Sequence, residues 1–200
     1  MVRKLELLAP AKNLECGMAA VDHGADAVYI GAEMFGARAA AGNPVSDIEK
    51  LCRYAHQFGV KVYLTVNTII YDNEIDNVKI LLEKLDRVGV DAVLVQDMAL
   101  AEMVREMQKN GSKMELHAST QTDNRTKEKV EWLAGLGFNR VVLARELSIE
   151  EIDTIHKALP EVELEVFVHG ALCVSYSGQC YPSQYCFSRS ANRGECAQFG

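Results

Sequence analysis

The fold can be read from Gly24-Ala25-Asp26-Ala27-Val28, because a near copy stands at Gly89-Val90-Asp91-Ala92-Val93. In both copies a glycine and an aspartate lead from an amphipathic stretch into an apolar run. A glycine at that point takes the left-handed backbone conformation that ends a helix. Gly59 and Gly137 hold the same place before two other runs. The resulting repeat of about 28 residues is the length of a βα unit.

Short β-branched runs alternate with amphipathic stretches along the chain. Within Asp47–Phe58 and Ile75–Val88 the apolar residues recur at helical spacing. Two helix starts resemble capping boxes, at Ser46–Glu49 and at Ser148–Glu151. Strands that alternate with helices predict a parallel sheet. The expected strands are Leu5–Leu8, Ala27–Ile30, Lys61–Ile70, Ala92–Val95, Met114–His117, Arg140–Ala144 and Leu164–Val168.

The number of repeats favours a barrel over an open nucleotide-binding sheet. A flavodoxin-like sheet usually has fewer strands, and a Rossmann domain should carry Gly-x-Gly-x-x-Gly after its first strand. Here Ala9-Pro10-Ala11-Lys12 follows the first run. We therefore predict an α/β fold, a TIM-like (β/α) barrel, which typically needs about 250 residues. We expect residues 1–170 to form an incomplete barrel, and residues 171–200 a cysteine-rich loop that continues into a missing C-terminal part.

Composition narrows the function classes. The net charge of −7 argues against a broad basic face for nucleic acid, although a local basic patch stays open. The N-terminus is too interrupted for a signal peptide, and no apolar run reaches the length of about 18 residues that a transmembrane helix needs. We expect a cytoplasmic protein without a membrane partner. In that compartment the six cysteines are more typical of thiols or metal ligands than of disulfides.

Polar residues follow nearly every predicted strand, at the end of a βα barrel where functional groups gather. They form a ring of Glu33, Arg38, Asn67, Thr68, Gln96, Asp97, His117, Ser119, Gln121, Arg145, Glu146 and His169. Helix capping or water binding would explain each of them singly. We expect six of them to face one cavity, with Arg145 suited to a carboxylate or phosphate through its planar fork. These six are Asn67, Gln96, His117, Gln121, Arg145 and His169.

The cysteines Cys173, Cys180, Cys186 and Cys196 gather near the C-terminus, with six, five and nine residues between them. Thiolates suit zinc or iron–sulfur clusters, although the paired Cys-x-x-Cys spacing of structural zinc sites is missing. Two other interpretations stay open: inert thiols in a glycine-rich loop, and a nucleophile–base pair of Cys173 and His169. The chain has no His-Glu-x-x-His, Gly-x-Ser-x-Gly or P-loop sequence.

Several segments together resemble peptidase family U32, the collagenase-like proteases. The most specific is Glu165–Cys173 followed by Ser177-Gly178-Gln179-Cys180. Further matching segments extend over essentially the whole chain. They are Leu7–Ala11, Gly24–Gly31, Phe35–Arg38, Thr65–Thr68, Val95–Asp97, His117–Gln121 and Leu143–Glu146.

The resemblance implies an activity and a cofactor. Gly178–Tyr181 and Arg189–Gly194 resemble the branch that hydroxylates a cytidine of 23S ribosomal RNA, while sister branches act on the wobble uridine of tRNA or on ubiquinone. It implies oxygen-independent hydroxylation with a 4Fe–4S cluster, and prephenate as co-substrate in the RNA branches. Peptidase activity is the alternative, as the family name says.

The resemblance also assigns candidate residues. It implies Cys173, Cys180 and Cys196 as cluster ligands, with the fourth ligand beyond residue 200 and Cys186 not required. Close relatives usually have a cysteine where this chain has Gly200. From the ring and the motif we take His117, Arg145, Glu165 and His169 as catalytic candidates. Asn67, Gln96, Gln121 and Arg145 are the substrate-binding candidates.

Overall fold

The computed structural model describes residues 5–37, 42–170, 173, 175–176 and 178–197, so Arg38 lies outside the described residues. Every strand pair in it is parallel. The strands are β1 (Leu8–Ala11), β2 (Ala27–Ala32), β3 (Gly42–Asn43), β4 (Lys61–Val66), β5 (Ala92–Val95), β6 (Glu115–Ala118), β7 (Arg140–Val142) and β8 (Glu163–Glu165).

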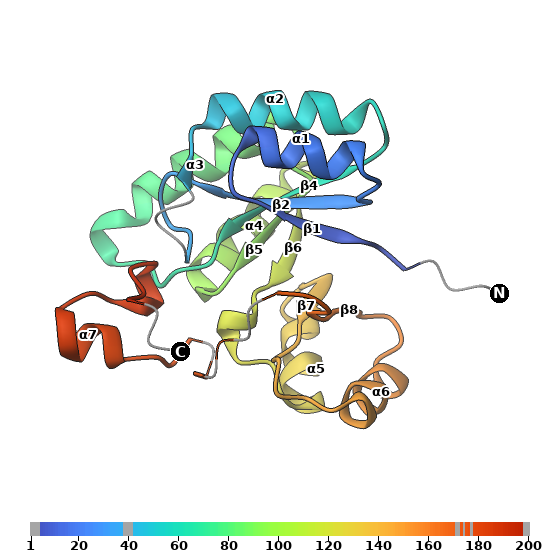
Figure 1. The fold of residues 1–200 in the computed structure, drawn as a ribbon, viewed down its shortest axis with the longest axis vertical. Coiled ribbons are helices and arrows are strands. Elements are labelled where there is room, and N and C mark those ends of the chain that lie inside the picture. Colours follow the sequence, from blue (N-terminus) through green and yellow to red (C-terminus); the bar gives the residue numbers. More distant parts are fainter. Residues whose placement is uncertain (1–4, 38–41, 171–172, 174, 177, 198–200) are drawn as a thin grey trace.

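One helix follows each long strand except the last, and all six pack outside the curved sheet (Figure 1). A short seventh helix, α7, lies in the cysteine-rich segment, apart from these layers. The helices are α1 (Leu14–Asp22), α2 (Val45–His56), α3 (Ile75–Val88), α4 (Met98–Lys109), α5 (Lys127–Gly135), α6 (Ile149–Ala158) and α7 (Pro182–Phe187). Three 3₁₀ turns are η2 (Asp72–Glu74), η3 (Thr120–Thr122) and η4 (Ala191–Arg193).

The sheet order is β1-β2-β4-β5-β6-β7-β8, with β3 paired to β2 at one end. Successive strands are neighbours, as in a (β/α) barrel. Among the described residues β8 and β1 do not pair, so the sheet is a barrel that stays open between its first and last strands. The predicted TIM-like, incomplete barrel is therefore confirmed. None of the described helices combines the length and apolar character needed to cross a membrane.

The two faces of the sheet are buried in different ways. Outward-facing residues such as Ile30, Leu64 and Val93 are fully buried against the helices and belong to the large core. The inward face holds only a small apolar group, which includes Tyr63 and Leu94. Because strand side chains alternate between faces, the remaining inward positions are left to polar residues. The barrel interior is therefore a mixed polar core.

The joints behave as the sequence predicts. Gly24 and Gly89 have φ values of 92° and 87°, the left-handed region that most side chains avoid. Ser148 caps α6, and the Glu151 carboxylate accepts the Ser148 amide in return, which confirms that capping box. The capping box at Ser46 is wrong. Pro44 precedes the first turn of α2, so Ser46 lies inside the helix.

Some strand bounds also differ from the prediction. The first strand begins at Leu8 and runs to Ala11, whereas the exposed Leu5 and Leu7 precede it. Its predicted bounds are wrong because the apolar run Leu5–Leu8 includes residues that the sheet does not bury. The third run ends at Val66, four residues before the predicted Ile70. The two-residue β3 has no β-branched residue and gave no signal in the sequence.

Candidate functional site

Several polar ring residues connect the loops at the carboxyl ends of the strands. The side chain of Asn67 accepts a hydrogen bond from the amide of Ala37 at 2.9 Å and donates one to Ser119 Oγ at 3.1 Å. It therefore bridges the loops after β2 and β6. The buried Thr68 donates to the carbonyl of Phe35 at 3.2 Å. These side chains hold the strand-end loops together in the described structure.

The loop after β6 satisfies its own polar groups. Asn124 is fully buried and donates to the carbonyls of Ser119 and Val142 at 3.0 and 2.8 Å. The hydroxyl of Thr122 donates to Asn124 Oδ1 at 2.7 Å. Asp97, in the preceding loop, caps α4 and also accepts the amide of Ile70 at 3.0 Å. The capping interpretation therefore holds for these positions.

Gln96 and Gln121 lie against the cysteine-rich segment. Gly178 has a φ of 73°, and a Cβ at this position would collide with the carbonyl oxygen of Gln121. The same Cβ would lie 3.2 Å from Gln96 Nε2. Only glycine fits this close approach. The cysteine-rich segment thus packs directly over the carboxyl ends of β5 and β6.

The other ring residues point elsewhere. Arg145 is partly buried, with its guanidinium carbon 6.0 Å from the centre of the Phe167 ring. Glu33, Glu146 and His169 are exposed. None of the six residues expected to share a cavity lines either of the two hollows described below. Their shared cavity stays a prediction.

Two catalytic candidates, His117 and Glu165, belong to a buried charge network inside the barrel. His117 Nε2 lies 3.2 Å from Glu115 Oε2, and its ring meets Tyr63 edge-on at 4.9 Å. Arg140 donates to Glu6 and Glu163, both at 2.5 Å, and lies 3.7 Å from Glu165. The side chain of Arg140 is 8% exposed, so the arginine at the centre of this network is buried, whereas Glu163 at its edge is 61% exposed.

Burial shifts the pKa values of two groups in this network, Glu165 and His117. Burial raises the pKa of Glu165 to about 7, although the charge of Arg140 opposes the rise. Burial also lowers the pKa of His117, against the hydrogen bond to Glu115, so the imidazole is neutral at pH 7. A carboxyl that titrates near neutral pH is suited to general acid–base chemistry. Glu165 Oε2 is buried, and Glu165 lines neither of the hollows described below.

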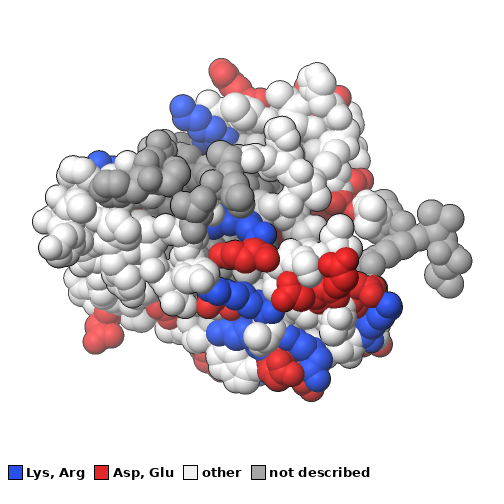
Figure 2. All heavy atoms as spheres, turned by 60° about the horizontal axis from the view of Figure 1, so that its bottom comes forward, with Lys and Arg blue, Asp and Glu red and all other residues white. Residues whose placement is uncertain are grey.

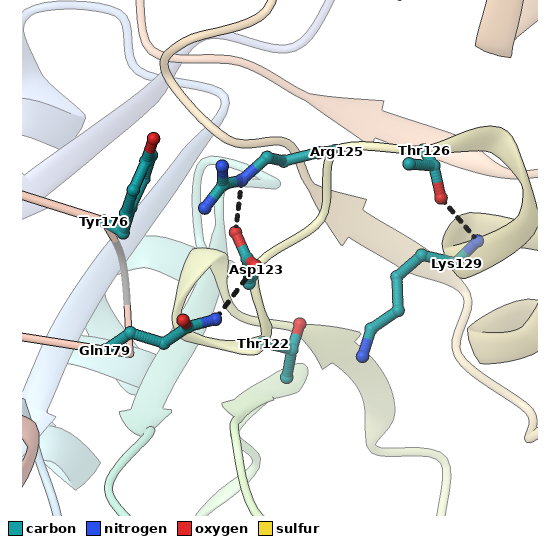
Figure 3. Close-up of a pocket in the computed structure, with 7 residues that line it drawn as sticks. All are labelled: Thr122, Asp123, Arg125, Thr126, Lys129, Tyr176 and Gln179. Carbon is teal, nitrogen blue, oxygen red and sulfur yellow. Dashed lines mark hydrogen bonds and ion pairs between the residues drawn. The ribbon is translucent and has the colours of Figure 1, made fainter.

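The larger hollow lies at the junction between η3 and α5 and has a volume of about 560 Å³. Figure 3 shows its charged side chains, Asp123, Arg125 and Lys129, beside Tyr176 and Gln179 of the cysteine-rich segment. Asp123 Oδ1 accepts a hydrogen bond from Arg125 Nε at 2.5 Å, and Asp123 Oδ2 accepts one from Gln179 Nε2 at 3.1 Å. The Arg125 guanidinium stands 4.1 Å from the centre of the Tyr176 ring.

A second hollow of about 250 Å³ lies where Arg193 meets the loop after β4. Arg193 donates to both oxygens of Glu74, at 2.9 and 2.5 Å, and to the carbonyl of Ile69. Its guanidinium stacks over Tyr71 at 4.6 Å. The hydrogen bond from Arg193 lowers the pKa of Glu74. This clamp fixes the cysteine-rich segment to the barrel.

Sequence analysis named Thr68 and Gln179 but missed the charged residues that line the two hollows. Arg125 and Lys129 flank Thr126, the N-cap of α5, and the short basic spacing Arg125-x-Lys127-x-Lys129 was the available signal. Arg193 lies in a segment that the resemblance did single out, although its partner Glu74 is 119 residues away.

The four clustered cysteines are all free thiols, and Cys180 is the least exposed of them. Their chemistry fits a thiolate-bound metal. Their geometry does not complete a site: within the described ranges, no three side chains among His, Cys, Asp and Glu stand where they would hold a metal ion. The described residues alone therefore do not complete a cluster site.

Comparison with known proteins relates the chain to one family. The model of peptidase family U32 matches residues 12–199. Over 98% of its length the chain is 48% identical to the 23S rRNA 5-hydroxycytidine C2501 synthase of Escherichia coli (strain K12). It is 37% identical to tRNA hydroxylation protein P1 of Bacillus subtilis (strain 168) over 99%, and 36% identical to a collagenase of Porphyromonas gingivalis over 98%. It spans 29%, 46% and 49% of those proteins, in that order.

A solved structure, that of the U32 peptidase Mk0906, shares the fold. It superposes with a TM-score of 0.63 at 17% sequence identity, over 83% of this chain and 70% of that one. At this identity the likeness speaks for the architecture alone.

Proposed function

This chain belongs to peptidase family U32, and we propose that it is part of an iron–sulfur-dependent, oxygen-independent RNA hydroxylase. The observation that carries the proposal is the 48% identity to an rRNA hydroxycytidine synthase, which extends over 98% of the chain. The chain spans 29% of that relative, so the activity of the whole protein is inferred from the shared part.

A cytidine of 23S ribosomal RNA is the substrate we favour, with a tRNA uridine second. The rRNA synthase is the more similar relative, at 48% identity against 37% for the tRNA hydroxylation protein. With a net charge of −7, this part of the protein would hold RNA at a local site rather than over a broad basic face. Figure 2 agrees: basic side chains on the face it shows are interspersed with acidic ones, without a continuous basic surface. We place the reaction in the cytoplasm, with prephenate as the co-substrate.

Cys173, Cys180 and Cys196 are the proposed ligands of a 4Fe–4S cluster. Support comes from their thiol chemistry and from the contacts that seat their segment on the barrel at Gly178 and Arg193. The amide of Cys180 also donates to Asn192 Oδ1 at 3.4 Å, which ties the two halves of the segment together. A fourth ligand would have to come from outside the described residues.

A peptidase is the alternative, because the family name and the relative named a collagenase both point to it. Its nucleophile and base would be Cys173 and His169. Both are exposed at the edge of the cysteine-rich segment, without a described partner group that would orient the imidazole. The buried Glu165 lacks the exposed position a peptide-cleaving acid would need. We therefore favour the hydroxylase.

The test compares RNA nucleosides from a wild-type strain and from a strain that lacks the gene. Mass spectrometry should find a hydroxylated cytidine in 23S ribosomal RNA that disappears on deletion and returns when the gene is restored. Loss of a hydroxylated tRNA uridine instead would move the substrate to tRNA. Unchanged nucleosides in both RNAs, with release of peptides from collagen by the purified full-length protein, would replace the hydroxylase with the peptidase.

A further inference from the structure

The hollow between η3 and α5 has the size and the chemistry of a ligand site. Its volume of about 560 Å³ falls within the usual range for small-molecule sites. Its walls come from the barrel loop, with Arg125 and Lys129, and from the cysteine-rich segment, with Tyr176 and Gln179. The hollow therefore exists only while that segment is seated on the barrel (Figure 3).

The charges of the hollow favour an anion. Asp123 is the acid that lines it, and both of its oxygens are engaged, by Arg125 Nε and by Gln179 Nε2. Asp123 thus balances the charge of Arg125 and holds its guanidinium in place. Lys129 then supplies the remaining positive charge, since among the described residues its ammonium makes no ion pair within 4.0 Å. It lies 5.1 Å from the centre of the Trp132 ring instead.

The start of α5 adds to this preference. The helix is nine residues long and its N-cap, Thr126, lines the hollow. Amide groups in the first turn of a helix lack partners within the helix and carry a partial positive charge. Phosphate groups are commonly bound at such a position when cationic side chains stand beside it.

The aromatic wall selects among anions. The Tyr176 ring is more than half exposed, and one of its faces carries the Arg125 guanidinium. An anionic group next to an exposed aromatic ring and an amide suits a nucleotide, whose base stacks while its phosphate pairs. We propose that this hollow binds a backbone phosphate of single-stranded RNA. The proposal rests on the proposed RNA hydroxylase function.

The test measures binding of a fluorescein-labelled single-stranded oligoribonucleotide to the full-length protein by fluorescence anisotropy. Lys129→Gln removes the charge that faces the hollow. Lys127→Gln is the matched control, because Lys127 lies two residues away on the same helix and pairs with Glu128 at 3.8 Å. Both positions are on the surface of α5, and equal melting temperatures would show that both variants fold.

Lys129→Gln should raise Kd about fivefold at 0.1 M salt, because losing one phosphate contact lowers the slope of log K against log salt by about 0.7. Lys127→Gln should stay within about twofold of the wild type, and Lys129→Arg should restore binding. Tyr176→Leu should also weaken binding, through lost stacking.

Four results would overturn the site. Equal weakening by Lys127→Gln and Lys129→Gln would mean that only net charge matters. Wild-type affinity in Lys129→Gln would place the RNA elsewhere while leaving the hydroxylase proposal intact, whereas a wild-type protein that binds no RNA would remove both. Displacement of RNA by inorganic phosphate, at matched ionic strength and as effectively as by unlabelled RNA, would make the ligand a free phosphate.

Discussion

The two ends of the barrel each contain an arginine paired with carboxylates, but their surroundings differ. At the amino end of β7, Arg140 is enclosed by Glu6, Glu163 and Glu165 and its side chain is 8% exposed. At the carboxyl end, Arg125 has one carboxylate partner and borders an open hollow of about 560 Å³. Arg140 is surrounded by protein groups, whereas one side of Arg125 faces the open hollow.

We infer from this difference that the charges around Arg140 serve stability and those around Arg125 serve binding. Charges buried at the amino end of a barrel bear on stability, whereas groups at the carboxyl end bear on binding and chemistry. His117 and Glu165 were chosen from the sequence as catalytic candidates, yet they lie in the enclosed network with Arg140 and Tyr63. If the comparison holds, changes near Arg140 alter stability, while changes near Arg125 and Arg193 alter binding or local order.

The largest expected effect is on Arg140. Arg140→Leu should lower the free energy of unfolding by about 3 kcal/mol, because it leaves the largely buried Glu165 and the partly buried Glu6 without a counter-charge. Urea denaturation of the purified protein measures this. The control is Arg53→Leu, whose partner Glu49 sits one turn away on the exposed face of α2, where a loss below about 0.5 kcal/mol is expected. Similar losses for both arginines would contradict the structural role of the network.

The next effect is a pH dependence that Glu165 introduces. Its pKa in the folded state is about 7 against a usual 4.5, so the folded protein favours the protonated carboxyl. The stability that this provides is present below the usual pKa and is lost as pH rises through about 7, a loss of about 3 kcal/mol at most. Glu165→Gln should remove this loss between pH 5 and pH 8. The more exposed Glu163→Gln is the control, and parallel pH curves for wild type and Glu165→Gln would refute the assignment.

A smaller and local effect is expected at the clamp between Arg193 and Glu74. Arg193→Leu should reduce the free energy of opening of residues 178–197 by about 1–2 kcal/mol, because it removes charge-assisted hydrogen bonds that are partly exposed. Hydrogen exchange followed by mass spectrometry would detect faster exchange there, while the exchange of β4 and β5 stays the same. Arg189→Leu is the matched control, as that side chain is exposed. Uniformly faster exchange would mean that the clamp supports the whole barrel.

The order of the barrel elements was predictable because it depends on local signals. The joints at Gly24 and Gly89 and the cap at Ser148 act within a few residues, and the structure confirms them. The capping box at Ser46 failed although its residues fit the motif, because Pro44 is the N-cap and the helix already begins at Val45. A motif match does not decide between two adjacent helix starts.

The sequence predicted where the candidate site lies better than it predicted which residues form it. Asn67 was expected to face a cavity shared with five other strand-end residues, and in the structure it hydrogen-bonds to the loops after β2 and β6, while the shared cavity stays a prediction. The interior network joins Arg140 to Glu6 across 134 residues, a distance at which sequence patterns give no signal. The hollow at Arg125 depends on how Tyr176 and Gln179 are placed beside it, which no periodicity in the sequence predicts.

The central claim, that the cysteine-rich segment serves RNA hydroxylation, is tested most directly in a deletion strain complemented with cysteine variants. The measured quantity is the fraction of hydroxylated cytidine in 23S ribosomal RNA, with the amount of each variant protein checked by immunoblot. Cys173→Ala, Cys180→Ala and Cys196→Ala should each abolish the modification, while Cys186→Ala keeps it near the wild-type level. A normal level of hydroxylated cytidine in the Cys173→Ala strain would contradict the account.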